Sequence, residues 1–186
     1  MSDTASRRMT ADAFLAWAQE QPEGQHFELC DGEVIAMAPE CSGHALTKAH
    51  VWRRLAETVE AAGRDCDVYP DGMAVVVDDA TVYEPDVVIR CGPRVPPDTV
   101  RLSDPVVIVE VLSPSTRGRD MRGKLIDYFR LPSLRHYVIV RPGDGAIIHH
   151  ARTPPETTIL TRIINDGTLH LDPPGITVTG LFLPPR

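Results

Sequence analysis

The chain has 186 residues, of which 42% are hydrophobic and 24% are charged, a composition that excludes a disordered or fibrous protein. Its formal net charge of −7 argues against a broadly basic nucleic-acid-binding surface, although a local basic patch is compatible with it. No stretch approaches the roughly 18–20 apolar residues of a membrane span, and no secretory leader pattern precedes residue 10. We therefore expect a single domain over residues 1–186, in the cytoplasm and without a membrane partner.

The first third of the chain predicts two helices with a hairpin between them. Thr10 is a helix-capping residue, and apolar residues over 11–21 follow it with helical spacing. Asp31-Gly32 lies between two short apolar runs, and this dipeptide favours a tight hairpin turn. Helical periodicity returns over 44–62, so we expect a second helix there.

From residue 68 onward the pattern changes to short strands rich in β-branched side chains. The predicted strands cover 73–77, 86–90, 106–112, 137–140, 146–150, 157–164, 168–171 and 176–183. A predicted helix over 119–130 separates two of them, and strand, helix and strand together indicate a crossover unit whose pairing direction the sequence leaves open. The expected fold class is α+β, with a mixed central sheet flanked by helices.

The four cysteines show neither a CxxC pair nor the spacing of a disulfide framework. They lie at Cys30, Cys41, Cys66 and Cys91. In a cytosolic protein this pattern predicts four reduced thiols.

The most informative residue is Glu110, because it interrupts an otherwise unbroken apolar strand. Such a strand is typical of the centre of a sheet that is covered on both faces. An ionised carboxylate there is costly unless a cation or several donors compensate its charge. We therefore expect Glu110 to be mostly buried and to bind a divalent metal ion. Without the ion its charge should be uncompensated, so that Glu110→Gln should stabilise the protein.

Asp86 opens another apolar strand and Lys124 lies on the predicted helix, which gives the chain the parts for phosphodiester hydrolysis. Hard cations such as Mg²⁺ bind one or two carboxylates together with water and substrate phosphate, and the ion lowers the pKa of its bound water. A nearby lysine orients the attacking water and stabilises the charge of the transition state. Lys124 flanks the apolar stripe of its helix, so it points either along the sheet or to Asp120 four residues earlier.

These residues belong to two stretches that resemble a known family. Tyr-Glu-Pro-Asp at 83–86 and Val-Glu-Val-Leu-Ser-Pro-Ser-Thr at 109–116, followed by Asp120, Lys124 and Tyr128, resemble the signature of the Uma-two family. The similarity extends over nearly the whole chain. Uma-two proteins are restriction-endonuclease-like members of the PD-(D/E)xK nuclease superfamily, so the resemblance implies a restriction-endonuclease-like fold and metal-dependent DNA cleavage.

The resemblance also implies where the catalytic lysine lies. In the wider superfamily the lysine follows the second acid by two residues on the same strand, and here that position is Leu112. The Uma-two pattern moves the lysine to the following helix, where Lys124 matches it. The resemblance therefore implies that Asp86, Glu110 and Lys124 are the catalytic residues.

The same comparison implies a set of metal ligands. Asp86 and Glu110 would bind the ion, with the backbone carbonyl of Val111 as a third ligand. Glu28 matches an additional acid of the family and would complete the site, although a glutamate in a hairpin also commonly faces solvent.

Substrate contacts are expected from a histidine and three arginines. His44 begins the predicted helix over 44–62, where a structural or capping histidine is the equal alternative. Arg117, Arg119 and Arg122 form a basic cluster beside the proposed site, and phosphate contact or simple solvation explains such a cluster equally well.

The expected function is thus a metal-dependent DNA endonuclease of the PD-(D/E)xK type that uses Mg²⁺ or Mn²⁺. Many such nucleases dimerise to cut two strands, and the analogy predicts a homodimer with DNA as its partner. One alternative is a catalytically silent, nuclease-like module that binds nucleic acid or protein. Another is a metal-dependent hydrolase of a small phosphorylated substrate, which a closed pocket would favour.

Overall fold

The computed structural model of the chain describes residues 8–112 and 121–183. Its helices and strands within these ranges are, in chain order, α1 (Ala11–Gln19), β1 (Phe27–Cys30), β2 (Glu33–Ala36), α2 (Ser42–Ala61), β3 (Cys66–Pro70), β4 (Ala74–Asp78), β5 (Thr81–Tyr83), β6 (Val87–Cys91), β7 (Arg101–Leu102), β8 (Val107–Val111), α3 (Met121–Tyr128), β9 (His136–Arg141), a short 3₁₀ helix (Pro142–Asp144), β10 (Ala146–Thr153), β11 (Thr158–Ile164), β12 (Leu169–Leu171) and β13 (Ile176–Val178). None of the helices in these ranges is both long and apolar enough to span a membrane.

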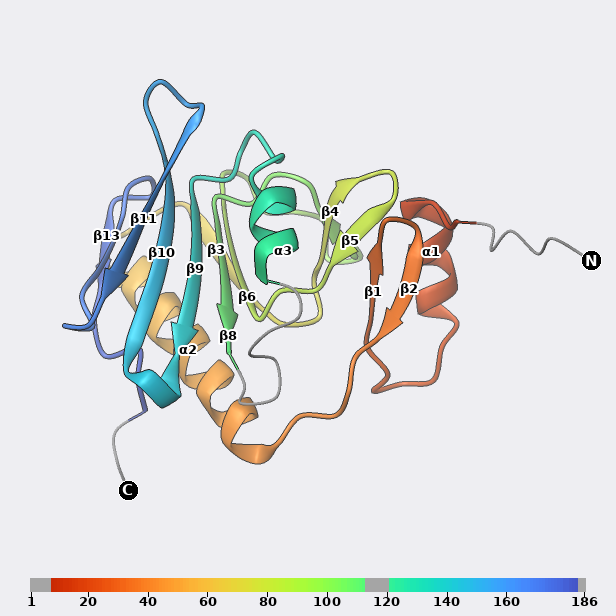
Figure 1. Ribbon diagram of the computed structural model, residues 1–186, viewed down its shortest axis with the longest axis horizontal. Coiled ribbons are helices and arrows are strands. Elements are labelled where there is room, and N and C mark those ends of the chain that lie inside the picture. Colours follow the sequence, from red (N-terminus) through yellow and green to blue (C-terminus); the bar gives the residue numbers. More distant parts are fainter. Residues whose placement is uncertain (1–7, 113–120, 184–186) are drawn as a thin grey trace, which may run out of the picture.

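A six-stranded sheet forms the centre of the molecule, in the order β11-β10-β9-β8-β6-β3 (Figure 1). β8 and β9 are parallel neighbours, whereas the other pairs are antiparallel, so the sheet is mixed as expected. Parallel neighbours need a crossover connection, and α3 lies in the one between β8 and β9. The predicted crossover unit is confirmed, and its pairing direction is parallel.

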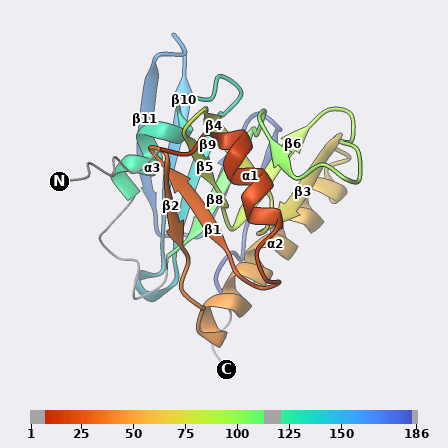
Figure 2. The ribbon, with the colours of Figure 1, turned by 90° about the vertical axis from the view of Figure 1, so that its right-hand side faces the viewer.

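Helices cover both faces of this sheet. α2 packs Val51, Leu55 and Val59 against one face, where Val109 and Val111 of β8 also point. α3 lies on the opposite face of the sheet (Figure 2). There Tyr128 packs with Ile108, which alternates with those valines along β8. Because side chains alternate along a strand, Glu110 belongs to the α3 face.

A second, five-stranded sheet in the order β2-β1-β5-β4-β7 lies beside the first, with α1 against it at one end of the molecule (Figure 1). The β1–β2 hairpin turns at Asp31 and Gly32, whose φ angles are 49° and 81°. Positive φ at both central residues is what a tight type I′ turn requires, which confirms the hairpin predicted from this dipeptide. The small β12–β13 hairpin packs against the α2 side of the central sheet.

The expectation of four reduced thiols is wrong, because Cys66 and Cys91 form a disulfide. The two residues lie directly opposite each other on the antiparallel strands β3 and β6. Strand pairing is a long-range feature that the spacing of cysteines along the chain does not reveal. Within the described residues, Cys30 and Cys41 take part in no disulfide.

Candidate functional site

The two acids singled out from the sequence lie on neighbouring strands. β6 and β8 pair antiparallel with Val87 opposite Val109, and continuing this register by one residue puts Asp86 opposite Glu110. The backbone N–H of Val111 donates to Asp86 Oδ2 at 2.6 Å, which fixes the carboxylate beside the end of β8. Asp86 is 8% exposed, so its carboxylate is held inside the molecule by backbone geometry.

α3 brings two donors to Glu110. Lys124 and Tyr128 lie one helical turn apart, and both contact Glu110 Oε1, the Lys124 ammonium at 3.2 Å and the Tyr128 hydroxyl at 3.0 Å. The lysine therefore points at the acids, which is one of the two orientations expected from its place on the helix. Leu112, at the usual lysine position of the superfamily, packs into the apolar cluster on the α3 face instead.

Glu28 joins the site from the five-stranded sheet. It is a buried residue of β1, and its Oε1 accepts hydrogen bonds from the Lys124 ammonium at 2.8 Å and from the backbone N–H of Glu84 at 3.1 Å. Lys124 thus joins two carboxylates from two different sheets. The site lies where those sheets meet.

His44, near the start of α2, hydrogen-bonds to the backbone of β8. Its Nε2 donates to the carbonyl oxygen of Val111 at 2.8 Å, and its Nδ1 lies 3.5 Å from Glu40 Oε2. A carbonyl oxygen has two lone pairs, so Val111 can accept this bond and still coordinate an ion. His44, which was expected to contact substrate, therefore contacts the Val111 carbonyl, which was expected to be a metal ligand.

Sequence reasoning missed a second lysine. Lys48 of α2 is buried, and its ammonium contacts Glu40, Asp71 Oδ2 at 2.5 Å and Asp86 Oδ1 at 3.5 Å. The sequence offered one indication of its role. Lys48 lies on the apolar stripe of α2 with Val51 and Leu55, and a charged residue is unusual there, as Glu110 is in its apolar strand.

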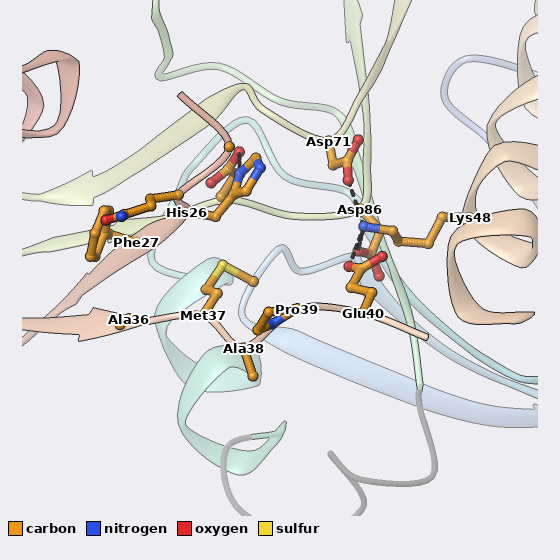
Figure 3. Close-up of a pocket in the computed structure, with 13 residues that line it drawn as sticks. His26, Phe27, Ala36, Met37, Ala38, Pro39, Glu40, Lys48, Asp71 and Asp86 are labelled. Carbon is orange, nitrogen blue, oxygen red and sulfur yellow. Dashed lines mark hydrogen bonds and ion pairs between the residues drawn. The ribbon is translucent and has the colours of Figure 1, made fainter. Parts of the chain in front are cut away.

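A cavity of about 450 Å³ opens beside Asp86 (Figure 3). Figure 3 shows the Lys48 side chain reaching from α2 towards Asp71, Asp86 and Glu40, with His26, Met37 and Pro39 among the other lining residues. His26 Nδ1 lies 2.9 Å from Glu84 Oε1 on the same cavity wall. The described residues that line the cavity make it acidic, with four carboxylates and one lysine: Glu40, Asp71, Glu84, Asp86 and Lys48.

The site as a whole carries excess negative charge. Among the described residues, five carboxylates contact the two lysines: Glu28, Glu40, Asp71, Asp86 and Glu110. When all five are ionised, the two ammonium groups leave three negative charges uncompensated. Burial and then the neighbouring charge of Glu110 raise the pKa of Asp86 to about 7. Burial also raises the pKa of Glu28.

The two lysines hold their protons firmly. Burial alone would lower the pKa of Lys124, but the carboxylates of Glu110 and Glu28 raise it above its ordinary value. The pKa of Lys48 is likewise raised, because hydrogen bonds to Asp71 and Glu40 outweigh burial. Both side chains are therefore fixed positive charges at neutral pH, and neither acts as a base.

The donors present match a hard divalent cation. Asp86, Glu110 and the Val111 carbonyl offer oxygen ligands, and the surplus negative charge favours a cation. Within the described ranges, no three histidine, cysteine, aspartate or glutamate side chains converge closely enough to hold an ion by themselves. Mg²⁺ usually binds through one or two carboxylates and completes its shell with water and substrate phosphate, so the residues present fit it.

The expectation that Glu110 carries an uncompensated charge is wrong. Its side chain is 15% exposed, and Lys124 and Tyr128 both donate to it. The long-range contacts of α3 supply the compensation, so Glu110→Gln is no longer expected to stabilise the metal-free protein.

A different effect of Glu110→Gln is expected, on the pKa of Asp86. Because the charge of Glu110 contributes to raising that pKa, its removal should lower the pKa of Asp86 from about 7 towards the ordinary 3.8. Carbon-13 NMR of the carboxyl groups in metal-free protein would measure the change. Glu33→Gln, at an exposed position of β2, should leave the pKa of Asp86 where it was. An unshifted Asp86 in Glu110→Gln would show that the two carboxylates do not interact.

The predicted arginine cluster lies outside the described residues. Arg117 and Arg119 fall in the segment 113–120, and the side chain of Arg122 is likewise not described. Their contact with substrate stays a prediction.

The chain resembles known proteins over most of its length. Residues 11–181 match the model of the family Uma2, described as "Putative restriction endonuclease". The chain is 29% identical over 134 residues to the uncharacterized protein slr1290 of Synechocystis sp., covering 72% of this chain and 68% of that protein. It is 24% identical over 162 residues to the uncharacterized protein sll1609 of the same organism, with 86% and 89% covered.

A solved structure shares the fold. The crystal structure of a "putative nuclease belonging to DUF820" from Anabaena variabilis superposes with a TM-score of 0.67 at 15% sequence identity, covering 86% of each chain. This likeness, together with the mixed sheet and its flanking helices, establishes the restriction-endonuclease-like α+β fold.

Proposed function

The chain belongs to the Uma-two family, described as restriction endonucleases, and from that membership and the geometry of the site we propose that it is a metal-dependent DNA endonuclease. The observation that carries the proposal is the contact of the Lys124 ammonium with Glu110 of β8. β8 pairs with β6, and Asp86 directly precedes β6, so the two acids lie next to each other. An ammonium, two strand-borne carboxylates and a backbone carbonyl are the parts that phosphodiester hydrolysis needs.

In this proposal Asp86, Glu110 and the Val111 carbonyl bind one Mg²⁺ or Mn²⁺, and Glu28 adds a further carboxylate nearby. The ion would supply a bound water of lowered pKa and neutralise charge on the phosphate. His44 orients the Val111 carbonyl, and the Val111 N–H orients Asp86. Asp86 and the Val111 carbonyl are therefore held in place before any ion or substrate arrives.

Lys124 acts as a donor and a fixed positive charge in the proposed reaction. Its raised pKa keeps the ammonium protonated, so it stabilises the charge that develops on the phosphate and orients the attacking water. Tyr128 shares the same Glu110 oxygen and keeps that carboxylate turned towards α3. Water attacks phosphorus, the bond from phosphorus to the leaving oxygen breaks, and the products are a phosphomonoester and an alcohol.

DNA and a second copy of the chain are the proposed partners. Cleavage of both strands of a duplex needs two active sites, which a symmetric homodimer supplies. Because the net charge of the chain is negative, contact with DNA through a local basic patch is favoured over contact through a broad surface. Arg117, Arg119 and Arg122 would form that patch by contacting phosphates.

The cavity beside Asp86 favours, by its volume, the alternative of a small phosphorylated substrate. Family membership favours DNA instead, because the family is described as a restriction endonuclease. The catalytically silent alternative has no support from the site, since Asp86, Glu110 and Lys124 are all present and in one place.

The test is cleavage of a supercoiled plasmid. The purified chain should nick or linearise the plasmid with Mn²⁺ or Mg²⁺, and should leave it intact with EDTA. p-Nitrophenyl phosphate and bis-p-nitrophenyl phosphate serve as small substrates for the alternative. Hydrolysis of these esters with intact plasmid would favour the small-substrate hydrolase, and no hydrolysis of any of them would favour the silent module.

A further inference from the structure

The chain contains 17 arginines but only two lysines, Lys48 and Lys124, and both lie in the candidate site. An arginine offers a planar fork, whereas a lysine offers a compact point charge with three rotatable donors. The chain therefore uses a compact ammonium only beside these carboxylates. The proposed function gives Lys124 a role, and it leaves Lys48 without one.

Lys48 is enclosed by carboxylates. Its side chain is 10% exposed, and its ammonium contacts Glu40, Asp71 and Asp86. The three acids come from separate parts of the chain: the segment before α2, the turn between β3 and β4, and the start of β6. The ammonium donates hydrogen bonds to Glu40 and Asp71 and forms an ion pair with Asp86 at 3.5 Å, so carboxylates surround it.

A cation surrounded by carboxylate oxygens is also the setting of a second metal ion in two-metal phosphodiesterases. In such sites the ions lie about 3.5–4 Å apart and stabilise both the attacking and the leaving oxygen. Asp86 is placed to be shared in the same way, because its Oδ1 faces Lys48 while its Oδ2 accepts the Val111 N–H beside Glu110. Each of the two acids thus has its own lysine: Lys48 contacts Asp86, and Lys124 contacts Glu110.

We propose that Lys48 is a built-in cation that takes the place of a second divalent ion and holds the Asp86 carboxylate, so that the site works with one exchangeable ion. The inference rests on the proposed function, because it assumes that Asp86 is a ligand of that ion. Lys48 is a positioning residue here, since it touches Asp86 and not the substrate.

The sharpest test is the number of ions bound. Calorimetric titration with Mn²⁺ should give one more ion per chain for Lys48→Met than for the wild type, because three carboxylates then face each other without a cation. Lys48→Arg, which keeps the charge, should bind the same number of ions as the wild type. So should Arg53→Met, which removes an exposed charge from α2. An unchanged number of ions in Lys48→Met would overturn the proposal.

The dependence of plasmid cleavage on Mn²⁺ distinguishes this proposal from a purely structural role of Lys48. At the Mn²⁺ concentration that saturates the wild type, Lys48→Met should cleave about 10-fold more slowly or worse, and further Mn²⁺ should restore the rate as a second ion replaces the ammonium. The dependence of the rate on Mn²⁺ should change from first to second order. Wild-type cleavage in Lys48→Met, or a loss that Mn²⁺ never restores, would overturn the proposal.

The double variant Lys48→Met/Glu40→Gln covers the case in which Lys48→Met fails to fold. It restores the net charge of the cluster, so a loss of cleavage there reports the missing cation and not a charge imbalance; a wild-type rate would overturn the proposal. If the wild type itself binds no Mn²⁺, the proposed function fails. In that case the number of ions bound by Lys48→Met, compared with the number bound by the wild type, still tests the role of Lys48.

Discussion

Lys124→Ala is expected to lower the rate of plasmid cleavage by about 10²-fold or more, the scale of losing one donor to the transition state. The ammonium is the only part of the proposed catalytic set that reaches Glu28 and Glu110 together. Lys124→Arg should rescue poorly, because a planar fork does not fit the space of a point charge between two carboxylates. Cleavage at saturating Mn²⁺, with the fold checked by circular dichroism, measures both variants.

Tyr128→Phe is the matched control for this prediction. It removes the other hydrogen bond to the same Glu110 oxygen and leaves the ammonium in place. Its effect on the rate should stay smaller than that of Lys124→Ala, because the hydroxyl carries no positive charge to stabilise the transition state. Lys124→Ala cleaving within a few-fold of the wild type would contradict the role of the lysine and favour a silent, nuclease-like module.

The second large effect concerns Asp86 and the pH dependence of stability. The pKa of Asp86 is about 7 in the folded protein, against an ordinary value of 3.8. An acid whose folded pKa is raised favours folding when protonated, so its contribution is complete below about pH 4 and is lost as the pH rises through 7. The loss in metal-free protein amounts to up to ~4 kcal/mol, and Asp86→Asn should abolish it.

Urea denaturation in EDTA at pH 5 and pH 8.5 measures the part of this loss that falls between the two values, up to ~3 kcal/mol. The wild type should lose more stability than Asp86→Asn between the two values, and Mg²⁺ should restore the wild type at pH 8.5 because the ion binds the ionised carboxylate. Mg²⁺ should not stabilise Asp86→Asn. Equal pH dependence in both proteins would mean that Asp86 titrates normally and is not held in a site that needs a cation.

Periodicity and turn chemistry in the sequence predict much of the fold. The helix over 44–62 corresponds to α2, and Asp31-Gly32 forms the turn of the β1–β2 hairpin. The strands β3, β5 and β7 were missed. β5 and β7 have only three and two residues, and β3 and β7 pair with strands that are distant in sequence. The Cys66–Cys91 disulfide was missed for the same reason, since it depends on the pairing of β3 with β6.

In the candidate site, too, residues that stand out in the local sequence were predicted, and contacts between distant segments were not. Glu110 stood out because a charge inside an apolar strand conflicts with its surroundings, and the resemblance to the Uma-two family pointed to Lys124. Lys48 conflicts with its helix stripe in the same way, yet the acids that explain it come from three separate segments. Which carboxylates meet an ammonium is decided by tertiary packing, and a single sequence does not contain that information in local form.

The most direct test of the account is a crystal of the protein soaked in Mn²⁺ and measured for anomalous scattering from the ion. One Mn²⁺ per chain is expected, coordinated by the carboxylates of Asp86 and Glu110 and by the carbonyl oxygen of Val111. Lys48 should remain among Glu40, Asp71 and Asp86. A fully soaked crystal with no ion on Asp86 and Glu110, or with Mn²⁺ bound only elsewhere on the chain, would contradict it.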